Sequence, residues 1–267
     1  MRNNQSKGKK KPVLIHKPYQ KGRAVSALAA KRGLKVLVYQ IALVFIFLFI
    51  GQMLLVESAP LRIVLNLLVV LGFFMLMVNE GSRAGLDDVA YAQIALNRTG
   101  DGKPLDDKDL ARCYHPLKGV FTVVLGMLPL IIIALVFSAI AREQVYTLGG
   151  LPSWVQGYER RADVGLALSY YHETSAIGLE AILRIVIRLL LFPYVNMAGT
   201  DAAGMLLTLE RLSPLLILII PMGYAVGYLR GPALRAQVHG AISTDAKRRK
   251  RREKKAIVQR KEPKNLV

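Results

Sequence analysis

The chain is poor in the residues that form disulfides and in residues that carry negative charge. Its 267 residues include one cysteine, Cys113, and one tryptophan, Trp154. A single cysteine excludes an intramolecular disulfide, so any part outside the cytoplasm is held by packing alone. Asp and Glu number 18 against 37 Lys and Arg, which gives a formal net charge of +19. Such a balance indicates an anionic surface or partner.

The sequence also lacks familiar catalytic and metal-binding patterns. It has no phosphate-cradling glycine loop and no G-x-S-x-G nucleophile elbow. The histidines fall in four different segments, so none has a second histidine at zinc-ligand spacing: they are His16, His115, His172 and His239. The acidic cluster at 106–109 fits a helix start better than a calcium loop. We therefore predict no catalytic residue, no metal site and no cofactor.

Apolar residues are abundant and grouped into long runs. Hydrophobic residues make up 53% of the chain and charged residues 21%. Four segments approach the length needed to cross a hydrocarbon core of about 30 Å as helices: Val36–Val56, Leu61–Val78, Val120–Ala141 and Pro214–Leu229. The first is longer than a signal-peptide core and lacks an A-x-A-like cleavage site, so we interpret it as a retained helix. These runs predict an all-α integral membrane protein with four transmembrane helices.

A fifth apolar segment, 176–198, leaves two alternatives. Glu180, Arg184 and Arg188 recur in it every four residues and line one side of a helix. Three central charges would cost about 7 to 10 kcal/mol on insertion, against about 4 to 7 kcal/mol gained from the apolar residues. We therefore favour an amphipathic helix at 176–192, interfacial or re-entrant, with its arginines among the headgroups and Pro193 ending it.

The alternative is a chain with five transmembrane helices. The same three side chains would then be charges inside the membrane and could line a substrate-binding groove for an anionic ligand. The choice between the two alternatives decides the number of crossings.

Positive charge is concentrated at both ends of the chain. Met1–Lys35 holds 11 basic residues and no acid, and Arg230–Val267 holds 13 basic residues and three acids. Basic segments beside membrane spans stay in the cytoplasm, so both termini are predicted there. This requires an even number of crossings, which four helices supply. We expect a multi-pass protein of the cytoplasmic membrane, of bacterial type.

The predicted organisation follows from these boundaries. Helical pieces at 87–96 and 105–114 form a hairpin after a break at Asn79-Glu80-Gly81. The segments, in order, are a largely disordered basic cytoplasmic arm (1–35), a transmembrane hairpin (36–78), a cytoplasmic helical hairpin (79–118), a transmembrane helix (119–141), an extracytoplasmic or interfacial region (142–213), a transmembrane helix (214–230) and a polybasic cytoplasmic tail (231–267).

The densest positive charge lies in the tail. The candidate lipid-binding or partner-binding residues are Lys247, Arg248, Arg249, Lys250, Arg251, Arg252, Lys254 and Lys255. Their charge density fits anionic headgroups, an acidic protein partner or the ribosome. No aromatic residue is interleaved to stack on bases, so sequence-specific nucleic-acid binding is not expected. We favour a topological anchor with lipid contact.

Gly223, Gly227 and Gly231 form a row at four-residue spacing that permits close helix approach. We favour an internal helix pair, with a homo-oligomer as the alternative. The leading function hypothesis is a non-catalytic subunit, adaptor or assembly factor. The first alternative is a small transporter or insertase-like protein with an Arg184/Arg188 groove, and the second is a membrane enzyme using Tyr170, His172 and Glu173.

Overall fold

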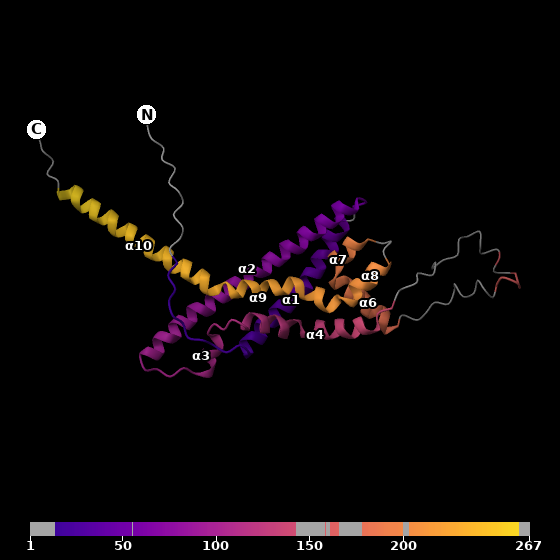
Figure 1. Cartoon of the computed structure of the whole chain (residues 1–267), viewed down its shortest axis with the longest axis horizontal. Helices are drawn as coiled ribbons and strands as arrows, with labels where there is room; N and C mark the ends of the chain where they lie inside the picture. The colour runs from indigo at the N-terminus through magenta and orange to yellow at the C-terminus, as the bar shows by residue number, and fades with distance from the viewer. Residues whose placement is uncertain are drawn as a thin grey trace, which may run out of the picture. The chain divides into compact units, whose positions relative to one another are not determined.

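The structure is a computed structural model, and it describes residues 14–54, 56–142, 158, 161–165, 178–199 and 203–261. All regular secondary structure in these residues is α-helical (Figure 1). The helices are α1 (Ala27–Met53), α2 (Ala59–Gly100), α3 (Asp107–Arg112), α4 (Lys118–Ile140), α6 (Leu179–Leu190), α7 (Phe192–Ala198), α8 (Ala203–Arg211), α9 (Ser213–Leu229) and α10 (Gly231–Lys261).

Three of these helices, α1, α2 and α4, are long and apolar enough to cross a membrane. The number rises to five if the bent pairs α6–α7 and α8–α9 each count as one span. Large apolar side chains on these helices are exposed, among them Phe49 at 78% and Ile132 at 52%. So much exposed apolar surface is typical of contact with lipid. The prediction of an all-α, multi-pass membrane protein is confirmed at this level.

The helix α2 is continuous over 42 residues, which corresponds to about 63 Å. The expected break at Asn79-Glu80-Gly81 is therefore wrong. Gly81 is a packing residue, because a Cβ atom there would lie 2.0 Å from the carbonyl oxygen of Tyr224. The second predicted piece of the hairpin does form a separate short helix, α3, after a turn at Gly102 with φ +76°.

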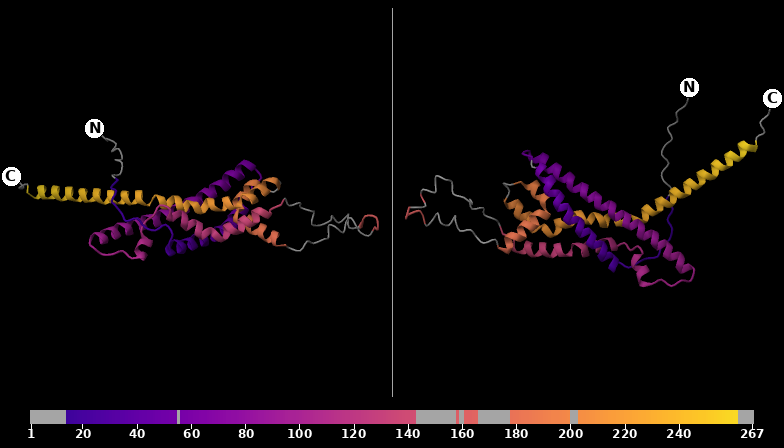
Figure 2. Two further views of the ribbon diagram at one scale, coloured as in Figure 1. Left: turned by 60° about the horizontal axis from the view of Figure 1, so that its bottom comes forward. Right: turned by 180° about the vertical axis from the view of Figure 1, so that it is seen from behind.

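The chain forms two compact units. Unit 1 contains Met1–Gly33, Met75–Leu125 and Met222–Val267, and unit 2 contains Leu34–Phe74 and Gly126–Pro221. The helices α1, α2, α4 and α9 each contribute residues to both units. Figure 2 shows these helices from two further sides.

In unit 1 the N-terminal arm is ordered by backbone hydrogen bonds. The amide of Gln20 donates to the carbonyl of Ala92 at 3.1 Å, and that of Gly22 donates to Tyr114 at 2.9 Å. The lack of a side chain at Gly22 permits this approach, since a Cβ would lie 2.3 Å from the carbonyl oxygen of Cys113. The expectation of a largely disordered arm is therefore wrong for residues 14–35, while residues 1–13 lie outside the described part.

In unit 2 two helix pairs bend sharply. The axis turns by 90° between α6 and α7 and by 62° between α8 and α9. The expectation that Pro193 ends a helix is wrong, because Pro193 lies in the first turn of α7. Amide groups in the first turn have no partner within the helix, so a proline there costs no hydrogen bond. The segment predicted as an amphipathic helix is thus α6, followed by a separate short helix.

Candidate functional site

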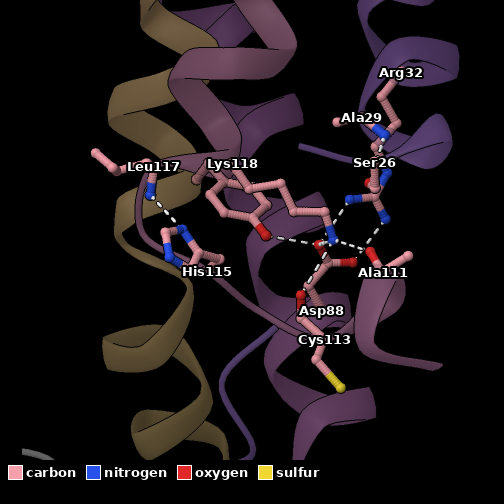
Figure 3. Close-up of polar contacts among 10 residues, drawn as sticks. Ser26, Ala29, Arg32, Asp88, Ala111, Cys113, His115, Leu117 and Lys118 are labelled. Carbon is pink, nitrogen blue, oxygen red and sulfur yellow. Dashed lines mark hydrogen bonds and ion pairs between the residues drawn. The ribbon is translucent and has the colours of Figure 1, made fainter. Parts of the chain in front are cut away.

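A buried ionic cluster in unit 1, which we call the Asp88 cluster, consists of Arg32, Asp88, Lys118 and Tyr228. Both terminal nitrogens of Arg32 donate to the carboxylate of Asp88 at 2.8 Å, in bidentate geometry. Lys118 Nζ donates to the same carboxylate at 2.7 Å and Tyr228 Oη at 2.6 Å. Figure 3 shows Arg32 and Lys118 converging on Asp88. Bidentate, charge-assisted bonds of this kind are among the strongest that proteins make.

The ammonium group of Lys118 is completely buried and fully hydrogen-bonded. Its other two donors go to the carbonyl oxygens of Ala111 at 2.7 Å and Cys113 at 3.2 Å (Figure 3). A buried charge is tolerated only when it is paired in this way. The cluster therefore fastens α1, α2, α4 and α9 of unit 1 together, and its carboxylate is engaged by three donor side chains.

The groups around the Asp88 cluster are held in their neutral forms. Burial raises the pKa of the Cys113 thiol, so it is not a thiolate nucleophile near neutral pH. Burial, with a smaller contribution from Tyr19, raises the pKa of Tyr114 to about 12. The Tyr114 ring stacks on Tyr228 at 5.2 Å between centroids. This arrangement offers packing and hydrogen bonds, and supplies no activated base or nucleophile.

His115 lies at the turn before α4. Its Nδ1 accepts a hydrogen bond from the amide of Leu117 at 3.2 Å (Figure 3). Burial lowers the pKa of His115, and the nearby charges of Lys21 and Lys118 lower it further. The neutral ring is the form that can accept this bond, so His115 serves as a turn residue here.

A second ionic cluster, in unit 2, contains the three charged residues singled out from the sequence. We call it the Glu210 cluster: Glu180, Arg184, Arg188 and Glu210. Arg188 Nε donates to Glu210 at 2.7 Å, and Arg184 Nη2 donates to Glu180 at 2.9 Å. Arg184 also lies 3.5 Å from the second oxygen of Glu210. Two guanidinium groups and two carboxylates thus balance one another.

The charged side of α6 faces the interior of unit 2. Arg184 is 8% exposed, while Ile182 and Ile185 are 49% and 58% exposed. The Arg184 guanidinium donates to the carbonyl of Arg142 at 2.7 Å and lies over the Phe137 ring. This orientation differs from the expectation that the arginines lie among headgroups. It also leaves little unpaired positive charge for an anionic substrate.

The glycine row lies against α2 within unit 1. A Cβ at Gly227 would lie 2.0 Å from the carbonyl oxygen of Val78, and one at Gly231 would lie 2.6 Å from that of Gly85. Ser82 Oγ donates to the carbonyl of Gly227 at 3.3 Å. Gly223 is buried in the same helix, α9. Gly227 and Gly231 therefore pack against a helix of the same chain, α2, whose Gly81 and Gly85 in turn approach the backbone of Tyr224 and Tyr228.

The polybasic segment is helical and exposed. Every residue from 245 to 253 is exposed, and Lys254 and Lys255 follow in the same helix, α10. The first part of α10 is fixed to α2 through Gln93, whose Oε1 lies 3.1 Å from Arg235 Nε and 2.9 Å from a ring nitrogen of His239. Burial lowers the pKa of His239, with Arg235 and Lys17 adding to the effect.

Sequence reasoning missed the residues that neutralise or complete both clusters. No local pattern singles out Asp88, because its partners are 30 to 140 residues away. Glu210 could have been suspected, since the apolar stretch 181–230 has only one other acid, Asp201. Tyr170, His172 and Glu173 lie outside the described residues. Within the described part, no group of three or more His, Cys, Asp and Glu could hold a metal.

Comparison with models of known protein families, with characterised proteins and with solved structures finds no significant similarity.

Proposed function

We propose that the protein is a non-catalytic, multi-pass membrane protein that acts as a subunit or adaptor. Its α10 helix would present fixed positive charge to an anionic partner at the cytoplasmic side. The observation that carries this proposal is the exposure of every residue from 245 to 253 in a continuous helix whose first part is hydrogen-bonded to α2. A helical segment that is polar and exposed on all sides, as residues 245 to 253 are, is suited to contact a partner.

The topology we propose has four crossings, made by α1, α2, α4 and α9, with both termini in the cytoplasm. The α6–α7 pair would be re-entrant. With 12 residues, α6 reaches only about 18 Å, and a 90° bend follows it. Its Leu179, Ile182 and Ile185 side chains are exposed and Arg184 is buried, as expected for a helix with one side in lipid.

The two ionic clusters favour a structural rather than a chemical role. The carboxylates of Asp88 and Glu210 are each engaged by two cationic side chains. An Arg184/Arg188 groove would need guanidinium groups free to meet a substrate. The paired geometry therefore gives the transporter and enzyme alternatives less support than the adaptor.

The experiment is purification of the tagged protein from its native membrane in mild detergent, with quantitative identification of all co-purifying molecules. The test variant replaces the six residues Lys247–Arg252 with Gln. A charge-matched control replaces six basic residues of the N-terminal arm with Gln: Lys7, Lys9, Lys10, Lys11, Lys17 and Lys21.

We expect a stoichiometric partner with the parent and with the control, and its loss with the α10 variant. Recovery of the chain alone, or an unchanged partner in the α10 variant, would contradict the proposal.

A further inference from the structure

We infer that the basic run of α10, Lys247–Arg252, docks on the phosphate backbone of a nucleic-acid duplex. This names the class of partner for the adaptor role and rests on that proposal. The run contains six consecutive Lys and Arg residues and no acid. Because the run is helical and fully exposed, it fits a nucleic-acid phosphate backbone better than a lipid surface.

The positive charge of the run surrounds the helix. At 3.6 residues per turn, six consecutive residues cover every side. Lys247 and Arg251 lie on one side, whereas Arg249 and Arg252 lie on roughly the opposite side. A flat bilayer can neutralise only the side that faces it. A helix seated in a duplex groove has phosphates on both flanks.

This part of α10 has no apolar face. Helices that lie in a membrane interface insert apolar side chains on one side and keep charges on the other. From 245 to 253 the only apolar residue is Ala246. The run therefore has nothing with which to enter the headgroup layer.

A long stretch of helix separates the run from the proposed membrane span α9. Lys247 follows the end of α9, Leu229, by 18 residues, or about 27 Å of helix. Figures 1 and 2 show α10 leading away from the end of α9 without folding back beside it. The lipid surface potential decays within a Debye length of about 8 Å, so a helix of this length that leads away from the membrane would carry the run beyond its reach.

The contact is expected to be independent of base sequence. The run has no aromatic residue to stack on bases, and phosphate contacts alone give strong salt dependence. Each engaged cation lowers the slope of log K against log salt by about 0.9, which corresponds to roughly a factor of five in affinity at 0.15 M salt.

The test uses the full-length protein in nanodiscs of neutral phosphatidylcholine. Binding of a fluorescent 20-base-pair RNA duplex is followed by anisotropy at several salt concentrations, with a DNA duplex of the same length in parallel. Two charge-matched variants are compared, Lys247→Gln/Arg251→Gln and Arg249→Gln/Arg252→Gln. Vesicles of phosphatidylserine and phosphatidylcholine serve as competitor.

We expect each double variant to weaken duplex binding by about 30-fold at 0.15 M salt and to reduce the salt slope by about 2. Equal binding of the RNA and DNA duplexes would indicate recognition of the phosphates that both share. Preference for the RNA duplex would indicate recognition of the A-form backbone. Loss of affinity in only one of the two variants, an unchanged salt slope, or displacement of the duplex by the vesicles would overturn the inference.

This outcome is independent of the purification described above. A stoichiometric protein partner together with no duplex binding would remove the inference and leave the adaptor role. Duplex binding by the purified protein, without any partner recovered from the native membrane, would support the inference and remove the adaptor role.

Discussion

The Asp88 cluster of unit 1 and the Glu210 cluster of unit 2 both neutralise a buried carboxylate, but they differ in how completely their polar atoms are hydrogen-bonded. Each places one buried carboxylate between two cationic side chains. In the Asp88 cluster, Lys118 is fully buried and both carboxylate oxygens accept short hydrogen bonds. In the Glu210 cluster, Arg184 Nε has no hydrogen bond and lies 3.5 Å from the carboxylate. The second cation is similarly exposed in both clusters, Arg32 at 24% and Arg188 at 25%.

The same contrast extends to other buried polar atoms. Among the described residues, all the buried side-chain polar atoms without a hydrogen bond belong to unit 2: they are on Gln40, Arg62, Arg184, Tyr194 and Ser213. Unit 1 combines satisfied polar groups with glycine-mediated helix contacts. Unit 1, to which α10 belongs, is thus closely packed with its buried polar groups paired, whereas unit 2 retains unused hydrogen-bonding capacity.

The largest effect is expected from Asp88→Asn. This change leaves the fully buried Lys118 and the partly exposed Arg32 without their counter-charge, and breaking a buried pair costs about 3–5 kcal/mol. We expect a large drop in the midpoint of thermal unfolding of the detergent-solubilised protein. Asp87→Asn is the matched control, because Asp87 is exposed on the same helix. Equal midpoints for the two variants would contradict the claim that the buried, ion-paired Asp88 stabilises unit 1 more than the exposed Asp87 does.

The next effect tests the helix contact of unit 1. Gly227→Ala places a Cβ 2.0 Å from the backbone of Val78, which must then move. We expect a loss of about 1–3 kcal/mol, typical of overpacking. Gly72→Ala, on the same helix α2 as Val78, meets nothing within 4 Å and should be neutral or slightly stabilising. Chemical unfolding in mixed micelles measures both, and equal destabilisation by both would remove the packing argument.

A smaller loss is expected from Glu210→Gln, about 1–3 kcal/mol. It is lower than for Asp88 because Arg184 keeps its bonds to Glu180 and to the Arg142 carbonyl, whereas the fully buried Lys118 loses its ion-pair partner when Asp88 is neutralised. Glu180→Gln, whose side chain is 44% exposed, should cost less than about 1 kcal/mol. Should Glu210→Gln prove as damaging as Asp88→Asn under the same unfolding conditions, the two clusters would have to be regarded as equivalent.

The smallest effect is a pH dependence located in unit 1. The pKa values of His115 and His239 are lowered by burial in the folded protein, so the unfolded chain binds protons first as pH falls. Stability should be complete above the unfolded value of about 6.5 and decline as pH drops through the lowered folded values. Thermal unfolding between pH 7 and pH 5 should show this slope. The double variant His115→Gln/His239→Gln should flatten it, and an unchanged slope would exclude these two groups.

The sequence predicted those features that depend on local pattern. Apolar runs predicted the membrane-length helices, and four-residue spacing placed Glu180, Arg184 and Arg188 on one side of α6. It did not predict which way that side faces, because orientation depends on Glu210, a residue 22 positions beyond Arg188. It also misjudged Gly81, whose lack of a side chain serves a helix contact rather than a turn.

The proposed topology is tested by measuring on which side of the membrane each segment lies. In this topology both basic ends lie on the cytoplasmic side and the α6–α7 pair is re-entrant. Single cysteines at Ser6, Thr99, Asp201 and Ser243 would be labelled in intact cells and inverted vesicles, in a Cys113→Ser background shown to fold. We expect Ser6→Cys, Thr99→Cys and Ser243→Cys to react only from the cytoplasmic side, and Asp201→Cys only from the opposite side. Reaction of Ser6→Cys and Ser243→Cys from opposite sides, or of Asp201→Cys from the cytoplasm, would contradict the account.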